Sequence, residues 1–483
     1  MSQPDSQYTM AVVGTGFASS FFLAHYLKHA GPDARILVLE RGVHDTHKWQ
    51  VQNRRSSSIP FQKTFTKEGH PDKEWVFTIG FGGGSNCWWG GTPRLMPNDF
   101  RLKSKYGVGR DWPLSYEELE PYYQAVEEAM SISGPPDGSP YPRSKPYPQP
   151  PHRFSDPDAM LKKAYPDKFF LQPTARSRVP MRGRGRCCAN GVCHICPVNA
   201  KFTIQNGLPH VYKDPRVTLL LGATVETLDI KGQVASGVRF THDGKEQRAA
   251  ADMVVLGANA FFNPLVMMRS GMDDPLLGKR LHEQLSITID VDLKGVDNFG
   301  ASTVISGLAY TFYDGEHRRD RAACMIESWN KPDMLRPDFG KWRQLARYRL
   351  IFEDLPDDEN HVKIDPAAPG RPIAYHKAPS SYAMRSIDAL ESLVPAKLLN
   401  PLPVERVNYN RWIEGTESHI LGTTVMGNDA STSVIDRHLV HHNVRNLLVL
   451  GGGAFPTCSP ANPTLTISAL SLWAASNLTG SKL

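Results

Sequence analysis

The N-terminal 42 residues contain the pattern that restricts the fold most. An apolar run over residues 9–13 leads into Gly14-Thr-Gly16, a helical pattern follows, and a second apolar run over residues 35–39 ends at Glu40. Two short apolar runs separated by one helix predict a β-α-β unit whose strands are parallel. We therefore expect a domain built on a parallel sheet.

The turn after the first run has the form Gly14-x-Gly16-x-x-Ser19. The two glycines permit a tight turn and let a pyrophosphate approach the N-terminus of the helix. Ser19 replaces the third glycine of this pattern with another small side chain. Glu40 lies where an acidic residue accepts hydrogen bonds from a ribose hydroxyl. The pattern predicts a bound dinucleotide without separating FAD from NAD, and a purely structural turn is the alternative.

The chain of 483 residues is too long for one ordinary domain and suits two closely joined ones. Its 40% hydrophobic and 22% charged residues are typical of a globular protein with a sizeable core. We expect a dinucleotide domain made of residues 1–110, 200–285 and 411–483, a linker over 111–199, and a substrate domain over 286–410.

Local patterns predict further elements. Ser115 with Glu118 three residues later predicts an N-cap and capping box at the start of a helix. Three strand-like runs, 217–221, 225–230 and 234–241, predict a small antiparallel sheet.

Charge and hydropathy exclude some functions. The net charge of +6 is small and the basic residues are scattered, so nucleic acid is not an expected partner. No run approaches the roughly 18 apolar residues of a membrane helix, so we expect no span of its own. Residues 1–8 are polar and lack an export signal, which predicts a cytoplasmic protein, or one exported to the periplasm with a signal-bearing partner.

Four of the seven cysteines, Cys187, Cys188, Cys193 and Cys196, lie within ten residues. This clustering allows three interpretations. The thiolates can bind an iron–sulfur cluster. Three of them can bind zinc together with His194. Alternatively, a disulfide can join one pair.

Several segments together resemble the glucose–methanol–choline (GMC) family of FAD oxidoreductases. In the order of that family they are Gly83–Gly91 with Asn98–Phe100, Leu256–Ala260 with Pro264 and Ser270-Gly271, Leu277–Glu283, His419–Gly427, Ser433–Asp436, Asn446–Gly452, and Pro456-Thr457 to Thr466. The resemblance implies an α/β (α+β) fold, with a Rossmann-like FAD-binding domain and a second, substrate domain built on an antiparallel sheet. The FAD-binding residues that it implies, with those of the first turn, are Gly14, Gly16, Ser19, Glu40, Gly84, Ser85, Trp89, Gly90, Val225, Ala258, Gly452, Asn462, Pro463 and Thr464.

The same resemblance implies two catalytic residues. His419 matches the base of the family, and a neutral imidazole near pH 7 can accept the hydroxyl proton of an alcohol. A packed core histidine is the alternative. Asn462 matches the residue that orients the substrate oxygen, with a turn asparagine before Pro463 as the alternative. A helix is expected over 463–478, with its N-terminus directed at the flavin, where it favours negative charge.

One branch of the family fits best. The segment Tyr106–Tyr123 and the cysteine spacing are similar to the catalytic subunit of bacterial FAD-dependent sugar dehydrogenases. This similarity implies a 3Fe-4S cluster on Cys187, Cys188, Cys193 and Cys196. It also implies a small escort subunit and a cytochrome or quinone electron acceptor.

The expected function is therefore the oxidation of an alcohol group of a sugar, glycoside or polyol to a carbonyl, by hydride transfer to flavin. The electrons would then leave through the iron–sulfur cluster to an external acceptor. A first alternative is an alcohol oxidase that uses oxygen and whose cysteines are structural. A second is a non-catalytic flavin-binding subunit, against which the presence of both His419 and Asn462 argues.

Overall fold

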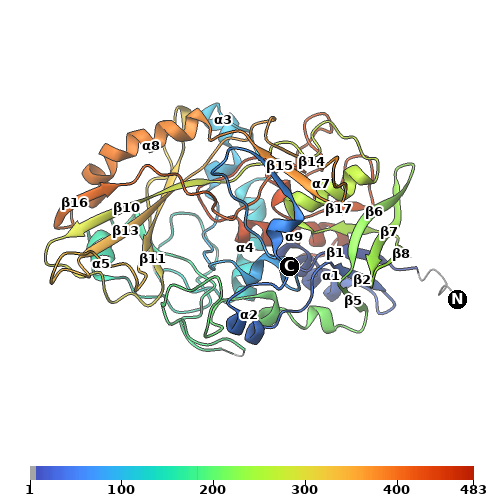
Figure 1. The fold of residues 1–483 in the computed structure, drawn as a ribbon, viewed down its shortest axis with the longest axis horizontal. Coiled ribbons are helices and arrows are strands. Elements are labelled where there is room, and N and C mark those ends of the chain that lie inside the picture. Colours follow the sequence, from blue (N-terminus) through green and yellow to red (C-terminus); the bar gives the residue numbers. More distant parts are fainter. Residues whose placement is uncertain (1–6, 137, 182) are drawn as a thin grey trace.

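The computed structural model of the chain describes residues 7–136, 138–181 and 183–483. A parallel sheet and a larger antiparallel sheet lie at opposite ends of the elongated molecule (Figure 1). Residues 1–6, on which the expectation about an export signal partly rests, lie outside the described residues. Within the described ranges, no helix combines the length and apolar character needed to cross a bilayer.

The parallel sheet confirms the predicted β-α-β unit. Its five strands, in spatial order, are β17 (Leu447–Val449), β9 (Val254–Leu256), β1 (Met10–Val13), β2 (Ile36–Glu40) and β5 (Val217–Leu221). Helix α1 (Phe17–His29) connects β1 to β2. Both faces of the central strands are buried, which explains why they read as unbroken apolar runs.

The prediction for residues 217–221 was wrong in one respect. This run is not part of a small antiparallel sheet, because β5 pairs in parallel with β2, with Leu37 opposite Thr218. A run of apolar residues predicts that a strand forms, but it does not predict which distant strand will pair with it. The small antiparallel sheet instead consists of β6 (Thr224–Lys231), β7 (Val234–His242) and β8 (Lys245–Ala250).

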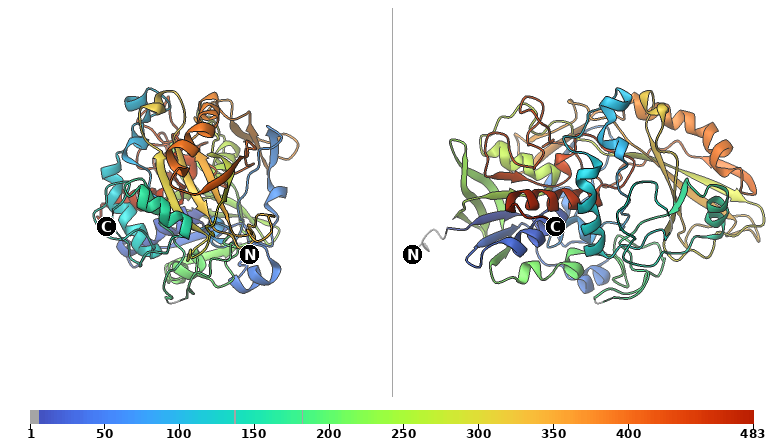
Figure 2. Two further views of the ribbon diagram at one scale, coloured as in Figure 1. Left: turned by 90° about the vertical axis from the view of Figure 1, so that its left-hand side faces the viewer. Right: turned by 180° about the vertical axis from the view of Figure 1, so that it is seen from behind.

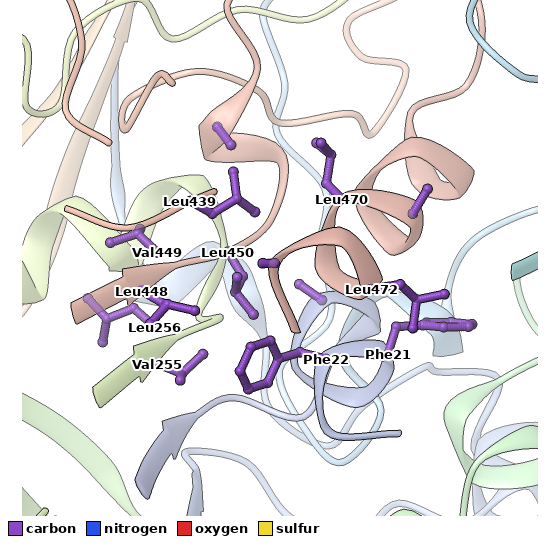
Figure 3. Close-up of a cluster of buried hydrophobic side chains, with 14 of the residues drawn as sticks. Phe21, Phe22, Val255, Leu256, Leu439, Leu448, Val449, Leu450, Leu470 and Leu472 are labelled. Atoms are coloured by element: carbon purple, nitrogen blue, oxygen red, sulfur yellow. The ribbon is translucent and has the colours of Figure 1, made fainter. Parts of the chain in front are cut away.

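Helices pack on the parallel sheet and form the main core with it. Helix α9 (Thr464–Thr479) lies against both α1 and α4 (Tyr116–Met130). Figure 3 shows Phe22 of α1 beside Val255 and Leu448 of the two neighbouring strands. The predicted capping box of α4 is confirmed, since Ser115 Oγ accepts a hydrogen bond from the backbone N of Glu118 and the Glu118 carboxylate accepts one from the Ser115 N.

The second sheet is antiparallel, as expected, and the predicted α/β (α+β) fold class is confirmed. Its six strands, in spatial order, are β16 (Val404–Tyr409), β10 (Leu285–Leu293), β13 (Leu345–Phe352), β12 (Cys324–Trp329), β11 (Ile305–Phe312) and β4 (Phe169–Leu171). Helices α8 (Ser381–Val394) and α5 (Asp156–Ala164) contribute side chains to the core on the apolar face of this sheet. The two views in Figure 2 show α8 lying across the sheet.

Several pairings cross the segments proposed as domains. Strand β4 belongs to the segment expected as a linker, yet it pairs with β11. A three-stranded sheet joins β3 (Thr66–Gly69) to β15 (Pro372–His376) and β14 (His361–Ile364). The remaining α-helices are α2 (His47–Asn53), α3 (Leu102–Tyr106), α6 (Ile204–Gly207) and α7 (Asn259–Arg269). The parallel sheet and the six-stranded antiparallel sheet both contribute residues to the wall of one cavity.

Candidate active site

A cavity of about 410 Å³ lies where the carboxyl ends of the parallel strands meet the antiparallel sheet. Open α/β sheets bind ligands at this edge. The predicted residues that line it are Gly14, Gly16, Glu40, Gly84, Trp89, Gly90, Val225, Ala258, His419, Gly452, Asn462, Pro463 and Thr464. Residues from five distant parts of the chain therefore converge on one site.

The first turn has two glycines with different requirements. Gly14 has a φ of +90°, and a Cβ atom there would lie 2.6 Å from the carbonyl oxygen of Gly257. A Cβ at Gly16 would meet no protein atom within 4 Å, although Gly16 lines the cavity. Gly14 is thus required by the protein backbone, whereas Gly16 leaves space for a ligand at the N-terminus of α1.

Glu40 is held rigidly at the end of β2. Its carboxylate accepts hydrogen bonds from the backbone N of Thr15 (3.1 Å), the Thr15 hydroxyl (2.7 Å) and the backbone N of Gly42 (2.8 Å). The side chain is buried but lines the cavity. This geometry places an acidic group where the predicted ribose contact requires one.

Two of the predicted residues lie behind the cavity wall. The Ser19 hydroxyl donates to the Val13 carbonyl (3.4 Å) and fills the space between α1 and the strand ends. The Ser85 hydroxyl donates to the Gly82 carbonyl (2.6 Å) and accepts from the backbone N of Ile204 (3.1 Å). Both side chains support the wall and neither belongs to the lining.

Asn462 presents an unsatisfied oxygen to the site. Its Oδ1 atom is buried and has no hydrogen-bond partner in the described structure. A Cβ on Gly91 would lie 3.2 Å from this oxygen, so only a glycine leaves the amide enough room. A buried polar atom without a hydrogen-bond partner lowers the stability of the fold, which is consistent with an oxygen that binds a ligand.

Gln284 determines which nitrogen of His419 carries the proton. The Gln284 Nε2 donates to the carbonyls of Ser459 (2.8 Å) and Ala461 (3.0 Å), so its Oε1 must face His419. Oε1 lies 3.2 Å from His419 Nδ1 and can only accept, so Nδ1 donates. The Nε2 of His419 is then unprotonated, as a general base requires.

Glu283 fixes the backbone that carries His419. Its carboxylate accepts hydrogen bonds from the Thr416 hydroxyl (3.2 Å) and from the backbone N of Glu417 (3.3 Å) and of His419 (3.0 Å). Lys73 forms a buried ion pair with the same carboxylate. The adjacent residues Glu283 and Gln284 therefore position the loop and the imidazole, respectively.

The surroundings of His419 keep it neutral. Burial lowers the pKa of His419 to about 3, and the positive charges of Arg349 and Lys73 lower it further in the same direction. Arg349 is itself paired with Glu417 at 2.6 Å. The imidazole is therefore neutral, and able to accept a proton, near pH 7.

The antiparallel sheet adds residues that the sequence did not single out. Glu327 of β12 lines the cavity and accepts hydrogen bonds from Gln172 Nε2 (3.1 Å) and Trp329 Nε1 (3.1 Å). Burial raises the pKa of Glu327 to about 7, and the negative charge of Glu417 raises it too. The only signal for this wall in the sequence was an alternation of polar and apolar residues along the strands.

The four clustered cysteines lie near this wall as free thiols. Burial raises the pKa of Cys193 to about 11, and the neighbouring thiols of Cys187 and Cys196 contribute to the rise. In the part of the chain that the structure describes, however, no group of three or more His, Cys, Asp or Glu side chains is arranged to hold a metal ion. As placed, the cysteines fit neither an iron–sulfur cluster nor zinc, so both interpretations stay predictions. The disulfide interpretation is not supported either.

Lys201 connects the cysteine segment to the cavity wall. Its buried ammonium donates to the backbone carbonyls of Asn86 (3.0 Å), Trp88 (2.8 Å) and His194 (3.2 Å). Trp89 stacks near His194 with their ring centroids 6.2 Å apart. The cysteine segment therefore packs directly behind the glycine-rich loop that lines the cavity.

Two stretches of the chain match models of a known family. Residues 174–286 match the N-terminal model of the GMC oxidoreductases, and residues 356–471 match the C-terminal model. The chain is a GMC oxidoreductase. The matched stretches contain the cavity-lining residues Val225 and Ala258, together with His419 and Asn462.

Known proteins resemble this GMC oxidoreductase over its whole length. It is 28% identical to the fructose dehydrogenase large subunit of Gluconobacter japonicus, covering 98% of both chains. It is 26% identical to 6'''-hydroxyparomomycin C oxidase of Streptomyces lividus, covering 97% of this chain and 90% of that one. The structure of pyridoxine 4-oxidase from Mesorbium loti superposes with a TM-score of 0.70 at 17% identity, covering 99% and 100% of the two chains.

The solved structure supports the fold alone, and the family supports the chemistry. The GMC oxidoreductase is an FAD-dependent enzyme that oxidises alcohol or sugar groups. The residues present fit FAD, because the open space above Gly16 and the unsatisfied oxygen of Asn462 belong to one continuous cavity. The enzyme prediction is confirmed, and the alternative of a non-catalytic flavin-binding subunit is not supported.

Proposed function

We propose that the enzyme oxidises a hydroxyl-bearing carbon of a sugar, glycoside or polyol to a carbonyl. The observation that carries this proposal is that His419 and Asn462 line one cavity, where Gln284 hydrogen-bonds His419 and the backbone carbonyl of Ala461, the residue before Asn462. The polar wall formed by Glu327 and Arg349 supports a substrate with several hydroxyl groups, since polar side chains in a pocket fix the orientation of a polar ligand.

The protein supplies the proton chemistry. His419 Nε2 accepts the proton of the substrate hydroxyl, and the resulting imidazolium is held by Gln284 through Nδ1. Asn462 orients the substrate oxygen through a hydrogen bond donated by its side-chain amide NH2 group, since that oxygen loses its own proton to His419. Both groups are positioned before the substrate arrives, so little reorganisation is needed during the reaction.

The N-terminus of helix α9 stabilises negative charge in the cavity. Its N-terminal residues Pro463 and Thr464 line the cavity, where the unpaired backbone N–H groups of the first turn favour negative charge. Bound FAD supplies the acceptor for the hydride that leaves the substrate carbon.

A panel of sugars, glycosides, polyols and simple primary alcohols tests the proposal. Each is incubated with the FAD-loaded enzyme and an artificial electron acceptor, with the His419→Ala variant as control. We expect turnover with at least one polyhydroxylated compound and much slower turnover with simple alcohols. Turnover confined to simple alcohols would refute the substrate class, and equal turnover by His419→Ala would refute the assigned base.

The electron acceptor forms a second part of the proposal. We propose a dehydrogenase whose electrons leave through a 3Fe-4S cluster on Cys187, Cys188, Cys193 and Cys196 to an external acceptor. The close sequence spacing of the four cysteines supports it. To bind the cluster, the four thiols would have to move closer together than they lie in this structure. Iron and acid-labile sulfide in the purified enzyme would support the cluster, and their absence after anaerobic purification would refute it.

The oxidase alternative rests on a specific similarity, since one relative of the chain is named as an oxidase. Stoichiometric hydrogen peroxide from an iron-free enzyme would favour it. A dehydrogenase would instead act with a small escort subunit and a cytochrome or quinone, and would be exported to the periplasm with its partner. Co-purification of the native complex and cell fractionation test these points, and a lone cytoplasmic enzyme would contradict them.

A further inference from the structure

The six-stranded sheet turns a polar face toward the cavity. Along β10, Thr288 and Asp290 lie on this face, while Ile287 and Ile289 lie on the other and are fully buried. This alternation of period two is the sequence pattern of a strand with one wet and one packed face. The pattern continues across the neighbouring strands.

Two rows of polar residues cross the strands on this face. The row nearer to His419 contains Glu327, Arg349 and Thr288, which are direct neighbours across β12, β13 and β10. Glu327 and Arg349 line the catalytic cavity. Glu327 and Arg349 of this inner row therefore belong to the active site already described.

The next row lies two residues, about 7 Å, further along the strands. It contains Trp329, Arg347, Asp290 and Asn408, again as direct neighbours across β12, β13, β10 and β16. A second cavity of about 640 Å³ opens over this row. Trp329 and Arg349 line both cavities, so the second adjoins the first along the sheet.

The lining of the outer cavity matches a polyhydroxylated ligand. It combines the indole of Trp329 with the amides of Asn408 and Asn410 and the carboxylate of Glu414. An aromatic face packs against the C–H groups of a sugar ring, and amides and carboxylates bind its hydroxyls. Among the residues that the structure describes, no aliphatic side chain, which would favour a hydrophobic ligand, belongs to this lining.

The charges of the outer cavity favour a neutral ligand. Arg347 is bound by both oxygens of Asp290, at 2.6 and 2.7 Å. Arg349 pairs with Glu417 at 2.6 Å, and Lys331 pairs with Asp333 at 3.3 Å. Because each of these cations has an acidic partner, an anionic sugar finds no unpaired positive charge among them.

We infer that this groove is an outer subsite, which binds the second ring of a neutral glycoside while the first ring is oxidised beside His419. The inference rests on the proposed oxidation of sugars and adds that the preferred substrate extends beyond one ring. Binding energy from the remote ring would hold the reacting carbon in place, so a truncated substrate should lose turnover as well as affinity.

The test compares monosaccharides with their disaccharides in the FAD-loaded enzyme. The ratio of kcat/KM for maltose and cellobiose to that for glucose is measured with an artificial acceptor. Asn408→Trp fills the groove from an exposed position on β16, and Asn53→Trp at the exposed end of α2 is the matched control. Calorimetry with maltose and cellobiose gives the dissociation constants of all three proteins.

For at least one disaccharide we expect a ratio of about ten or more in the wild type, falling toward one in Asn408→Trp only. Ratios near one in the wild type, or an equal fall in Asn53→Trp, would overturn the inference. If no saccharide is oxidised, the proposed function fails. Calorimetry still decides the subsite in that case, because disaccharide binding that Asn408→Trp abolishes supports it and the absence of binding overturns it.

Discussion

Gln284 offers the sharpest test of the active-site geometry, because its buried amide hydrogen-bonds the proposed base His419 and the backbone next to Asn462. Its Oε1 accepts from His419 Nδ1, and its Nε2 donates to the carbonyls of Ser459 and Ala461, directly before Asn462. The substitution Gln284→Met conserves volume and removes every one of these hydrogen bonds. Without the acceptor, the imidazole can carry its proton on Nε2, and in that form it cannot act as the base.

The size of the effect follows from the three contacts, at 3.2, 2.8 and 3.0 Å. A hydrogen bond contributes about 0.5–1.5 kcal/mol, and a buried carbonyl left without a donor costs about 1–3 kcal/mol. If about 1.5–3 kcal/mol of this is lost at the transition state, kcat falls by about 10–150-fold.

Steady-state kinetics and FAD content provide the assay for Gln284→Met. We expect a large fall in kcat with full FAD content. Gln284→Glu is the informative companion, since a carboxylate beside Nδ1 raises the pKa of His419 and moves the acid limb of kcat/KM to higher pH. A merely structural role would not move that limb. If Gln284→Met keeps kcat within a factor of about three at full FAD content, the positioning role is refuted.

Three further predictions concern the base, the substrate wall and the cofactor turn. His419→Ala should retain FAD and lose about 10²–10⁴-fold in kcat, measured by steady-state kinetics. Because the pKa of Glu327 is raised to about 7, its carboxyl is neutral below that pH and ionised above it. An ionised carboxylate accepts hydroxyl hydrogen bonds better, so kcat/KM should rise through about pH 7 in the wild type and lose this rise in Glu327→Gln. Gly16→Ala should leave the melting temperature of the FAD-free protein unchanged while weakening FAD binding, because the added Cβ meets no described protein atom within 4 Å and Gly16 lines the cavity. Gly14→Ala should instead destabilise the protein by about 1–3 kcal/mol in denaturant unfolding, since φ is +90° and the Cβ would lie 2.6 Å from Gly257.

Local sequence determined the elements whose signals are contained within a few residues. The first β-α-β unit, its glycine turn and the capping box at Ser115 were predictable because periodicity, turn geometry and side-chain capping act over short distances. The family motifs likewise singled out His419 and Asn462, which line one cavity in the structure.

Pairing between distant segments was not predictable in the same way. Strand β5 has an apolar pattern that fits either sheet, and only packing beside β2 decides that it runs parallel. The partnership of β3 with β15 joins residues about 300 positions apart, and no local preference encodes it. The arrangement of the four thiols also depends on side-chain positions that sequence spacing does not fix.

The opening turn illustrates the division well. The sequence by itself determined that Gly14 and Gly16 form a tight turn between a strand and a helix, because this glycine pattern follows a short apolar run and precedes a helical one. Only the tertiary structure decided that the carbonyl of Gly257 leaves no room for a side chain at Gly14, whereas Gly16 lines the cavity. Likewise, only the tertiary structure brought Gln284 and Glu327 to the site, since each is a single polar residue whose role arises from its neighbours across the fold.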